Sequence, residues 1–271
     1  VFIDIKGYSI ASYIPQGRNV GTIAQIHGGV GRNVAEDIAN LELKPTFIGL
    51  VDDNAMGEEV VRKLERHKVD TRFMRKVPNG MGTWLAIFDN NGDVVASVSK
   101  RPDHTPVEYI LDECGDEIFK DADSIAIEID TDREIVKKTF AYAEKYNKKV
   151  CITTNGVFLK DRLDILSKYD NIYQINISLH SENNKDNYLE DIFEVVDNLE
   201  YPYISYRFWT LDKSLDTLNN KYLDMIRLKY KVNELYDKMK LDNKVYLSLD
   251  SKFDWPSTSS SYYKEEGTCL G

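Results

Sequence analysis

Apolar positions along the first half of the chain recur with two periods. An apolar face spaced at every third and fourth position predicts a helix over 30–41, and it comprises Val30, Val34, Ile38 and Leu41. The same spacing predicts a helix over 54–67. Short apolar runs between these segments predict strands over 1–5, 9–14, 22–27, 46–51, 81–89, 93–100 and 123–129. Strands therefore alternate with helices from the start of the chain.

Turn and capping residues mark where several of these elements begin. Asn91-Gly92 accepts positive φ angles, so the flanking strands are expected to form a hairpin. The sequences Thr105-Pro106-Val107-Glu108 and Thr131-Asp132-Arg133-Glu134 have the spacing of capping boxes, which predicts that a helix begins at each.

The same alternation continues to the end of the chain. Apolar periodicity predicts helices over 160–167, 185–199 and 214–240, and strands over 149–153, 172–179, 203–209 and 245–249. Strands that alternate with helices form mostly parallel sheets covered by helices. The expected fold class is therefore α/β.

Charge and composition limit the function. The formal net charge is -10 with a pI near 5.0, which argues against nucleic acid and anionic membranes as partners. The hydrophobic fraction of 42% is enough for a sizeable core, and no apolar run approaches the roughly 20 residues that span a bilayer. We expect a soluble, cytoplasmic protein that acts on a small molecule.

Composition also changes near residue 150. Most of the 15 glycines precede this point and most of the 17 tyrosines follow it, which favours two parts, 1–149 and 150–271. Val1 stands where an initiator Met is usual, and no closing element follows Phe253. These features predict a truncated, processed or spliced chain.

The most informative segment is the glycine-rich run from His27 to Ala35, HGGVGRNVA. Glycines at a turn from strand to helix let backbone amides approach a hydroxyl or an anion, and the helix N-terminus adds partial positive charge. The residues alone fit a tight turn equally well.

The run GGVGRNVAEDIANL, followed by FIGLVDDNAMGEEV, resembles the N-terminal signature of the PfkB (ribokinase-like) carbohydrate kinases. The opening DIKGY and the pair Gly82-Thr83 are similar to the branch that includes pseudouridine kinases. The resemblance implies a ribokinase-like parallel sheet with helices on both faces. It also implies a small β lid, formed by strands around 9–27 and 81–99, through which a homodimer could form.

The family resemblance also implies a substrate site for a sugar or nucleoside. The residues implied to hold the sugar hydroxyls are Asp4, Gly28, Gly29 and Asn33, with Lys6, Arg18 and Asn19 as weaker candidates. Glu42 and Asp52 depart from the signature, because small residues are usual at both positions. Both are expected at loops or helix ends, where they affect the backbone more than the chemistry.

Family members carry a Gly-Ala-Gly-Asp segment that supplies an anion hole and the catalytic base, and no such segment follows residue 150. No catalytic residue is therefore assigned. The resemblance implies ATP with Mg as the cosubstrate of this transferase, but its site is expected to be missing.

Residues 150–271 resemble part of a radical SAM enzyme. The resemblance rests on three strand ends and on the segment from Phe253 to Cys269; the strand ends are TTNGV (153–157), ISLHS (177–181) and YRFW (206–209). It implies that Ser178 and Arg207 bind S-adenosylmethionine.

The cysteines do not support a metal cluster in this second part. Cys114, Cys151 and Cys269 cannot make the Cys-x-x-x-Cys-x-x-Cys loop that holds an iron–sulfur cluster, so no cluster is expected. Cys151 is expected to be a buried strand residue. His180 has no partner at a ligand spacing, so no metal site is predicted.

Three interpretations remain open. The chain is a catalytically incomplete sugar or nucleoside kinase, a fragment of a radical SAM enzyme, or a non-catalytic chimera of two half-domains. In the chimera, the halves join near 148–151, at a strand that both α/β folds share.

Overall fold

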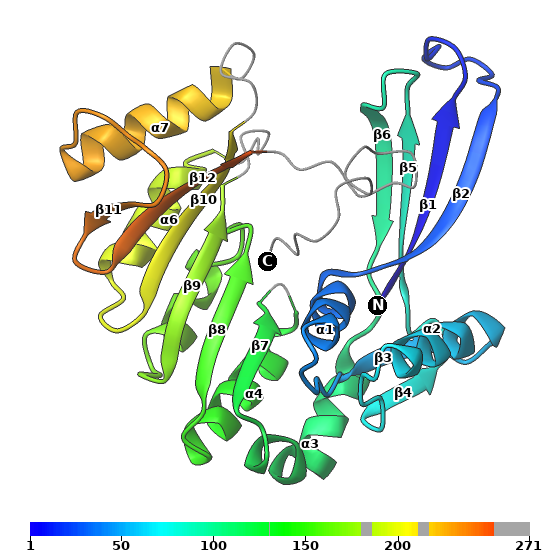
Figure 1. The fold of residues 1–271 in the computed structure, drawn as a ribbon, viewed down its shortest axis with the longest axis horizontal. Coiled ribbons are helices and arrows are strands. Elements are labelled where there is room, and N and C mark those ends of the chain that lie inside the picture. The colour runs from blue at the N-terminus through cyan, green and yellow to red at the C-terminus, as the bar shows by residue number, and fades with distance from the viewer. Residues whose placement is uncertain (130, 180–185, 211–216, 252–271) are drawn as a thin grey trace.

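The computed structural model describes residues 1–129, 131–179, 186–210 and 217–251, and these form three sheets with helices between and beside them (Figure 1). One sheet has four strands, one has six and one has two. In Figure 1 the four-stranded sheet stands on the right and the six-stranded sheet on the left, with helices at their base.

The four-stranded sheet has the order β2-β1-β5-β6. β1 lies antiparallel to β2 and parallel to β5, and β5 lies antiparallel to β6. The strands are β1 (Phe2–Ser9), β2 (Gly21–Gly28), β5 (Gly82–Phe88) and β6 (Val94–Lys100). The predicted hairpin is confirmed, because β5 and β6 pair antiparallel on either side of the Asn91-Gly92 turn. The Asp89 carboxylate stabilises this turn by accepting hydrogen bonds from the backbone N–H groups of Asn91 and Asp93.

The predicted strand over 9–14 is wrong, because β1 runs without a break to Ser9 and then enters an irregular connection. The Asn19 side chain holds this connection: its amide oxygen accepts a hydrogen bond from the Ile14 N–H at 2.8 Å, and its amide nitrogen donates to the Ile14 carbonyl at 3.0 Å. An apolar run here marks a turn, which sequence pattern alone does not distinguish from a short strand.

The six-stranded sheet has the order β11-β12-β10-β9-β8-β7 and is parallel except for β11. Its strands are β7 (Ser124–Glu128), β8 (Lys149–Thr154), β9 (Ile172–Ser178), β10 (Tyr203–Thr210), β11 (Met239–Asp242) and β12 (Val245–Ser251). The accompanying helices are α4 (Arg133–Lys145), η1 (Lys160–Arg162), α5 (Leu163–Leu166), α6 (Tyr188–Asp197) and α7 (Thr217–Tyr230).

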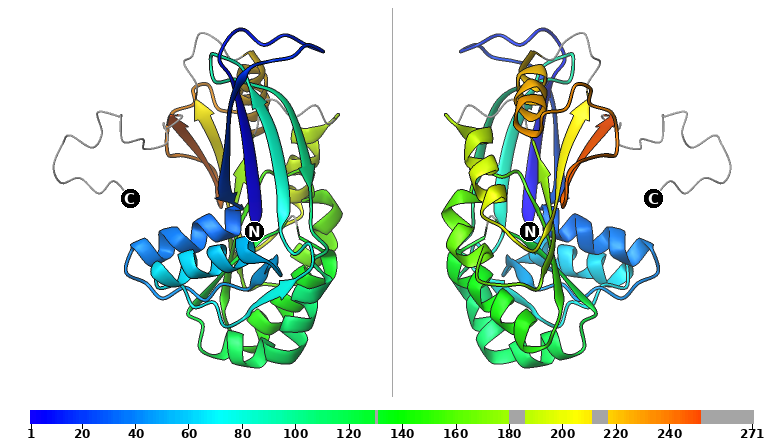
Figure 2. Two further views of the ribbon diagram at one scale, coloured as in Figure 1. Left: turned by 90° about the vertical axis from the view of Figure 1, so that its right-hand side faces the viewer. Right: turned by 90° about the vertical axis from the view of Figure 1, so that its left-hand side faces the viewer.

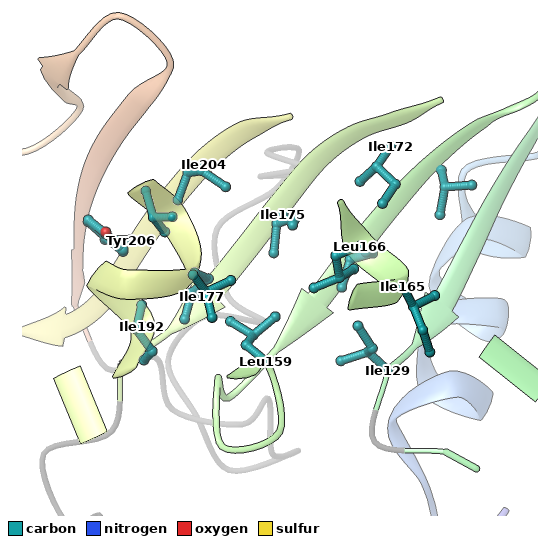
Figure 3. Packing of buried hydrophobic residues seen from close by; sticks show 14 of the residues in the cluster. Ile129, Leu159, Ile165, Leu166, Ile172, Ile175, Ile177, Ile192, Ile204 and Tyr206 are labelled. Atoms are coloured by element: carbon teal, nitrogen blue, oxygen red, sulfur yellow. The ribbon is translucent and has the colours of Figure 1, made fainter. Parts of the chain in front are cut away.

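Alternate residues of the parallel strands bury one face of this sheet against the helices. Ile152, Ile175 and Tyr206 are fully buried in a large cluster with side chains from α4, α5 and α6. Figure 3 shows Ile175 and Tyr206 together with Leu166 of α5 and Ile192 of α6. The residues between them, including Thr153, Asn176 and Ser205, are polar and half-buried or exposed. Strict alternation is unusual in parallel strands, which are mostly apolar on both faces. The second face of this sheet is therefore polar.

A smaller layer lies at the base of the four-stranded sheet (Figure 2). It contains α1 (Val30–Asn40), β3 (Gly49–Asp52), α2 (Ala55–Arg66), β4 (Met74–Val77) and α3 (Thr105–Lys120). Ile3 from β1 is buried here with Val60 and Leu64 from α2. β4 was not anticipated. Within the described residues no helix has the length and apolar character needed to cross a bilayer.

Two expectations about helix ends need correction. The helix predicted over 214–240 ends at Tyr230, because Lys231 adopts a positive φ of 55° and β11 then pairs with β12. α3 begins at Thr105, but Thr105 is already helical and its N–H is accepted by the Asp103 carboxylate. α4 follows Asp132 as its N-cap, so neither threonine caps its helix.

Glu42 closes α1 in a left-handed conformation with φ of 62°. Its N–H donates to the Ala39 carbonyl, and the N–H of Leu43 donates to the Ile38 carbonyl. These two bonds form a Schellman motif with Glu42 at the position where Gly is preferred. The expectation that Glu42 lies at a helix end is confirmed. Because Glu42 has a side chain, its left-handed backbone conformation is strained where glycine would not be.

We expect Glu42→Gly to raise the free energy of unfolding by about 1 kcal/mol, because a side chain in the left-handed region is strained. Chemical denaturation at neutral pH measures the effect. The matched control is Asp37→Gly, an exposed position inside α1, which should lower stability by about 1 kcal/mol. Destabilisation by both variants would contradict the assigned strain.

Candidate functional site

The glycine-rich loop joins the end of β2 to the start of α1, and its two glycines lie against β1. A Cβ on Gly28 would lie 2.5 Å from Oδ1 of Asp4, so only glycine leaves room for the carboxylate at this point. Gly29 has a φ of 103°, and a Cβ there would lie 3.1 Å from the Phe2 nitrogen. The sequence HGGVGRN therefore brings the carboxylate of Asp4 directly over the loop.

Asp4 is half-buried in β1. Burial raises the pKa of its carboxyl group above the usual value, and the positive charges of Lys6 and Arg32 oppose that rise. Within the described part of the chain, we find no hydrogen-bond donor to this carboxylate. A partly desolvated carboxylate with unused acceptor sites is suited to receive hydroxyl groups from a ligand.

Arg32 holds the loop from inside. Its side chain is 5% exposed; Nε donates to the Gly28 carbonyl at 3.1 Å and an Nη atom donates to the His27 carbonyl at 2.9 Å. The guanidinium also donates to the Asn33 amide oxygen and forms an ion pair with Glu36. One buried cation thus satisfies the last carbonyls of β2 and fixes two side chains of α1.

Sequence reasoning missed Arg32 because it expected apolar residues on the inner face of α1. Val30 and Val34 are instead 55% and 37% exposed, whereas Arg32 and Ala35 are buried. The carbonyl groups at the end of β2 need a donor, which valine cannot supply. An arginine directly after a Gly-x-Gly turn was the available signal.

The Asn33 side chain lies in the first turn of α1 with its orientation fixed by Arg32. Because its oxygen accepts from the guanidinium, its NH₂ group remains as a donor, and we find no partner for it among the described residues. The site therefore combines a carboxylate acceptor, an amide donor and the N–H groups at a helix N-terminus. This donor and acceptor set fits adjacent hydroxyl groups of a sugar.

The remaining first-half candidates have other surroundings. Asp52 ends β3, and its carboxylate accepts the Met81 N–H at 2.9 Å, which ties β3 to the start of β5. Asn19 holds the connection after β1, and Arg18 is exposed in that connection. Lys6 lies in β1, two residues beyond Asp4 and on the same face of the strand.

The structure also brings together the two candidates of the second half. Ser178 and Arg207 are paired in register across β9 and β10, and Ser248 of β12 lies opposite Arg207. All three are half-buried on the polar face of the six-stranded sheet. Binding of S-adenosylmethionine there stays a prediction.

Cys151 corrects an expectation, because it is exposed rather than buried. It lies on the polar face of β8, where its neighbours Val150 and Ile152 point to the core. Cys269 and His180 lie outside the described residues. Within the described residues, no group of three or more His, Cys, Asp or Glu side chains is placed to hold a metal ion.

Comparison with known proteins decides the family. A family model described as "pfkB family carbohydrate kinase" matches residues 2–152, which include the Asp4 strand, the glycine-rich loop and all strands of the four-stranded sheet. The chain belongs to the pfkB family of carbohydrate kinases. The predicted membership is therefore confirmed for the first half.

Two pfkB relatives of known activity are nucleoside kinases. The chain is 33% identical over 146 residues to a guanosine-inosine kinase of Exiguobacterium acetylicum, covering 54% of this chain and 48% of that protein. It is 29% identical over 98 residues to a pseudouridine kinase of Escherichia coli, covering 36% of this chain and 31% of that protein. The chain thus spans half or less of the length of these relatives.

A solved structure confirms the fold class. The ribokinase of Giardia lamblia superposes with a TM-score of 0.62 at 13% identity, covering 77% of this chain and 71% of that one. This share is larger than the segment 2–152, so the likeness in fold extends into the second half. The α/β fold is ribokinase-like. These comparisons do not test the radical SAM resemblance or the division at residue 150, and both stay predictions.

The four-stranded sheet occupies the position predicted for a lid, although β1 is part of it. One face carries exposed apolar side chains, with Ile23 at 81%, Leu85 at 40% and Val98 at 71%. Their register places them on neighbouring strands, opposite to the face of Asp4. Dimerisation of this pfkB protein through the sheet stays a prediction.

We expect Arg32→Met to lower the free energy of unfolding by about 3 kcal/mol, because it leaves two carbonyl groups without their buried donor and leaves Glu36 with Lys63, at 3.5 Å, as its remaining ion-pair partner among the described residues. Chemical denaturation measures this loss. The double variant Arg32→Met/Glu36→Gln should recover part of it, since the carboxylate charge that has lost its buried Arg32 partner is removed. Additive losses in the double variant would show that the pair is not coupled.

Proposed function

We propose that this chain binds the sugar moiety of a small sugar or nucleoside at Asp4, Gly28, Gly29 and Asn33, as the substrate half of a pfkB-type kinase. The observation that carries this proposal is the carboxylate of Asp4 over the glycine loop, which has no hydrogen-bond donor among the residues that the structure describes and lies beside the oriented amide of Asn33. The names of the two relatives, both nucleoside kinases, support a substrate of this class.

Recognition in this site follows from hydrogen-bond complementarity. Asp4 accepts from two hydroxyl groups, Asn33 donates to a hydroxyl oxygen, and Gly28 keeps the approach to the carboxylate open. A ligand that lacks a hydroxyl leaves a half-buried carboxylate unsatisfied, which is costly. Selectivity for a polyhydroxylated ring therefore depends on this carboxylate.

The family implies ATP with Mg, and the residues described here do not fit that pair. The sequence contains no Gly-Ala-Gly-Asp segment, so the backbone anion hole and the catalytic base that this segment supplies for reaction with ATP are missing from it. We therefore propose substrate binding for this chain and derive no phosphoryl-transfer step from it. We also propose that this chain is catalytically incomplete.

Asp4→Asn should separate binding from stability. Loss of a charge-assisted acceptor should weaken binding of inosine or ribose by at least about 10-fold. The folded-state pKa of Asp4 is raised, so its charged form is disfavoured in the fold and its stabilising contribution is lost as pH rises through that pKa. At neutral pH the variant should therefore melt no lower than the wild type.

Calorimetric titration and thermal melts of the same samples measure both quantities. Wild-type binding should also weaken on acidification through the raised pKa of Asp4, at a higher pH than for an ordinary aspartate. Asp37→Asn, an exposed change on α1, is the matched control and should alter neither quantity. If Asp4→Asn bound inosine and ribose with unchanged affinity, the assignment of the sugar site to Asp4 would be wrong.

A second candidate function is favoured by the polar face of the six-stranded sheet. We propose that Ser178 and Arg207, which the radical SAM resemblance implies, bind S-adenosylmethionine together with Ser248, which lies opposite Arg207 in the same cross-strand row. Support comes from the register that aligns the three residues and from their position near the carboxyl ends of parallel strands, where ligands of open α/β sheets bind.

S-adenosylmethionine at about 100 times its Kd should add roughly 2.7 kcal/mol to stability, which is a shift of a few degrees in Tm. Ser178→Val should remove this shift by filling the row with methyl groups, whereas Ser178→Ala should keep most of it. Absence of any shift in the wild type would rule out this second function and leave the sugar site untouched.

A further inference from the structure

The face of the four-stranded sheet that carries Asp4 also carries aromatic side chains. The register pairs Asp4 with Trp84 on β5 and with Ile26 on β2, so these three lie side by side on one face. Farther along the same strands, Tyr8 pairs with Phe88. The sugar site thus borders an aromatic surface one strand away.

These aromatic rings support one another. Tyr8 and Phe88 are stacked with centroids 4.8 Å apart, and Phe88 meets Trp84 edge-to-face at 6.3 Å. Lys6 reaches to 6.0 Å from the centre of the Trp84 ring. Such contacts limit the rotation of the indole. The orientation of the Trp84 side chain is therefore fixed by its neighbours on the same face of the sheet.

Trp84 remains half-buried rather than covered, and so does Phe88. Ile26 lies on β2, on the side of Asp4 away from Trp84, and is 45% exposed. Adjacent strands lie about 4.8 Å apart, so a ring held by its hydroxyl groups at Asp4 places its substituent over the neighbouring strand. A planar apolar substituent is the kind of group that an indole face binds well.

We propose that Trp84 is the specificity-determining residue of this site and that the substrate is a nucleoside, whose aromatic base stacks on the Trp84 indole while its ribose binds at Asp4. Phe88 and Tyr8 are positioning residues that brace the indole. This inference rests on the proposed function, because it requires the ribose to be held at Asp4 and Asn33.

The charge and chemistry of the surface agree with a neutral base. Lys6 is the basic side chain in the cross-strand rows around Trp84, and its ammonium can donate to carbonyl or ring-nitrogen acceptors of a base. Apart from Asp4, the other residues of these two cross-strand rows are apolar or small: Ile26, Ala24, Ala86, Ser97 and Ser99, which pairs directly with Trp84. A free pentose offers nothing to stack on the indole.

Titration of the whole chain with inosine and with ribose tests this inference. Inosine should bind about 10- to 100-fold more tightly than ribose, which is the contribution expected from stacking one base. Trp84→Ala should remove that difference by weakening inosine alone, and Trp84→Phe should keep most of it. Inosine should also quench indole fluorescence in the wild type, and the quenching should vanish in Trp84→Phe.

Leu85→Ala is the matched control, since Leu85 is the next residue on β5 and faces the opposite side of the sheet. It should leave the ratio of the two affinities unchanged. Equal loss of inosine and ribose binding in Trp84→Ala would assign Trp84 a structural role and overturn the inference. Equal affinities in the wild type would overturn it as well.

The two proposals fail in different ways. Ribose binding that depends on Asp4, without any preference for inosine, would keep the proposed function and remove the role of Trp84. If the wild type binds neither ligand, both the sugar site and the stacking residue are excluded.

Discussion

The guanidinium of Arg32 is the interaction on which the candidate site depends. It is buried between the end of β2 and the first turns of α1, where it satisfies two carbonyl groups, orients the Asn33 amide and pairs with Glu36. A buried arginine is tolerated only when its donors are matched. The same matched donors fix the glycine loop against β1, which brings Asp4 into the site.

The four-stranded and six-stranded sheets each carry candidate binding residues on one face. The four-stranded sheet presents Asp4 with an aromatic row on one face and exposed aliphatic side chains on the other. The six-stranded sheet buries one face under α4, α5 and α6 and leaves a polar face with Ser178 and Arg207. Both sheets are thus two-sided, with core or aliphatic residues on one side and candidate binding residues on the other.

At Asp4, the requirement for ligand binding opposes the stability of the empty protein. Burial raises the pKa of Asp4, so the charged group that suits a sugar hydroxyl is costly for the empty protein. A cost of this kind is common at functional sites, where a ligand rather than the fold satisfies the half-buried polar group.

The α/β alternation, the hairpin at Asn91-Gly92 and the family of the first half could be predicted from the amino-acid sequence, because period, turn residues and a glycine signature are local. The family signature also pointed to Asp4 and Asn33 as candidates. The inward position of Arg32, in place of Val30 or Val34, follows from tertiary packing, since it depends on carbonyl groups at the end of β2. Cross-strand register decided that Trp84 borders Asp4 and that Ser178 meets Arg207. Register joins residues far apart in the chain, and no local pattern encodes it.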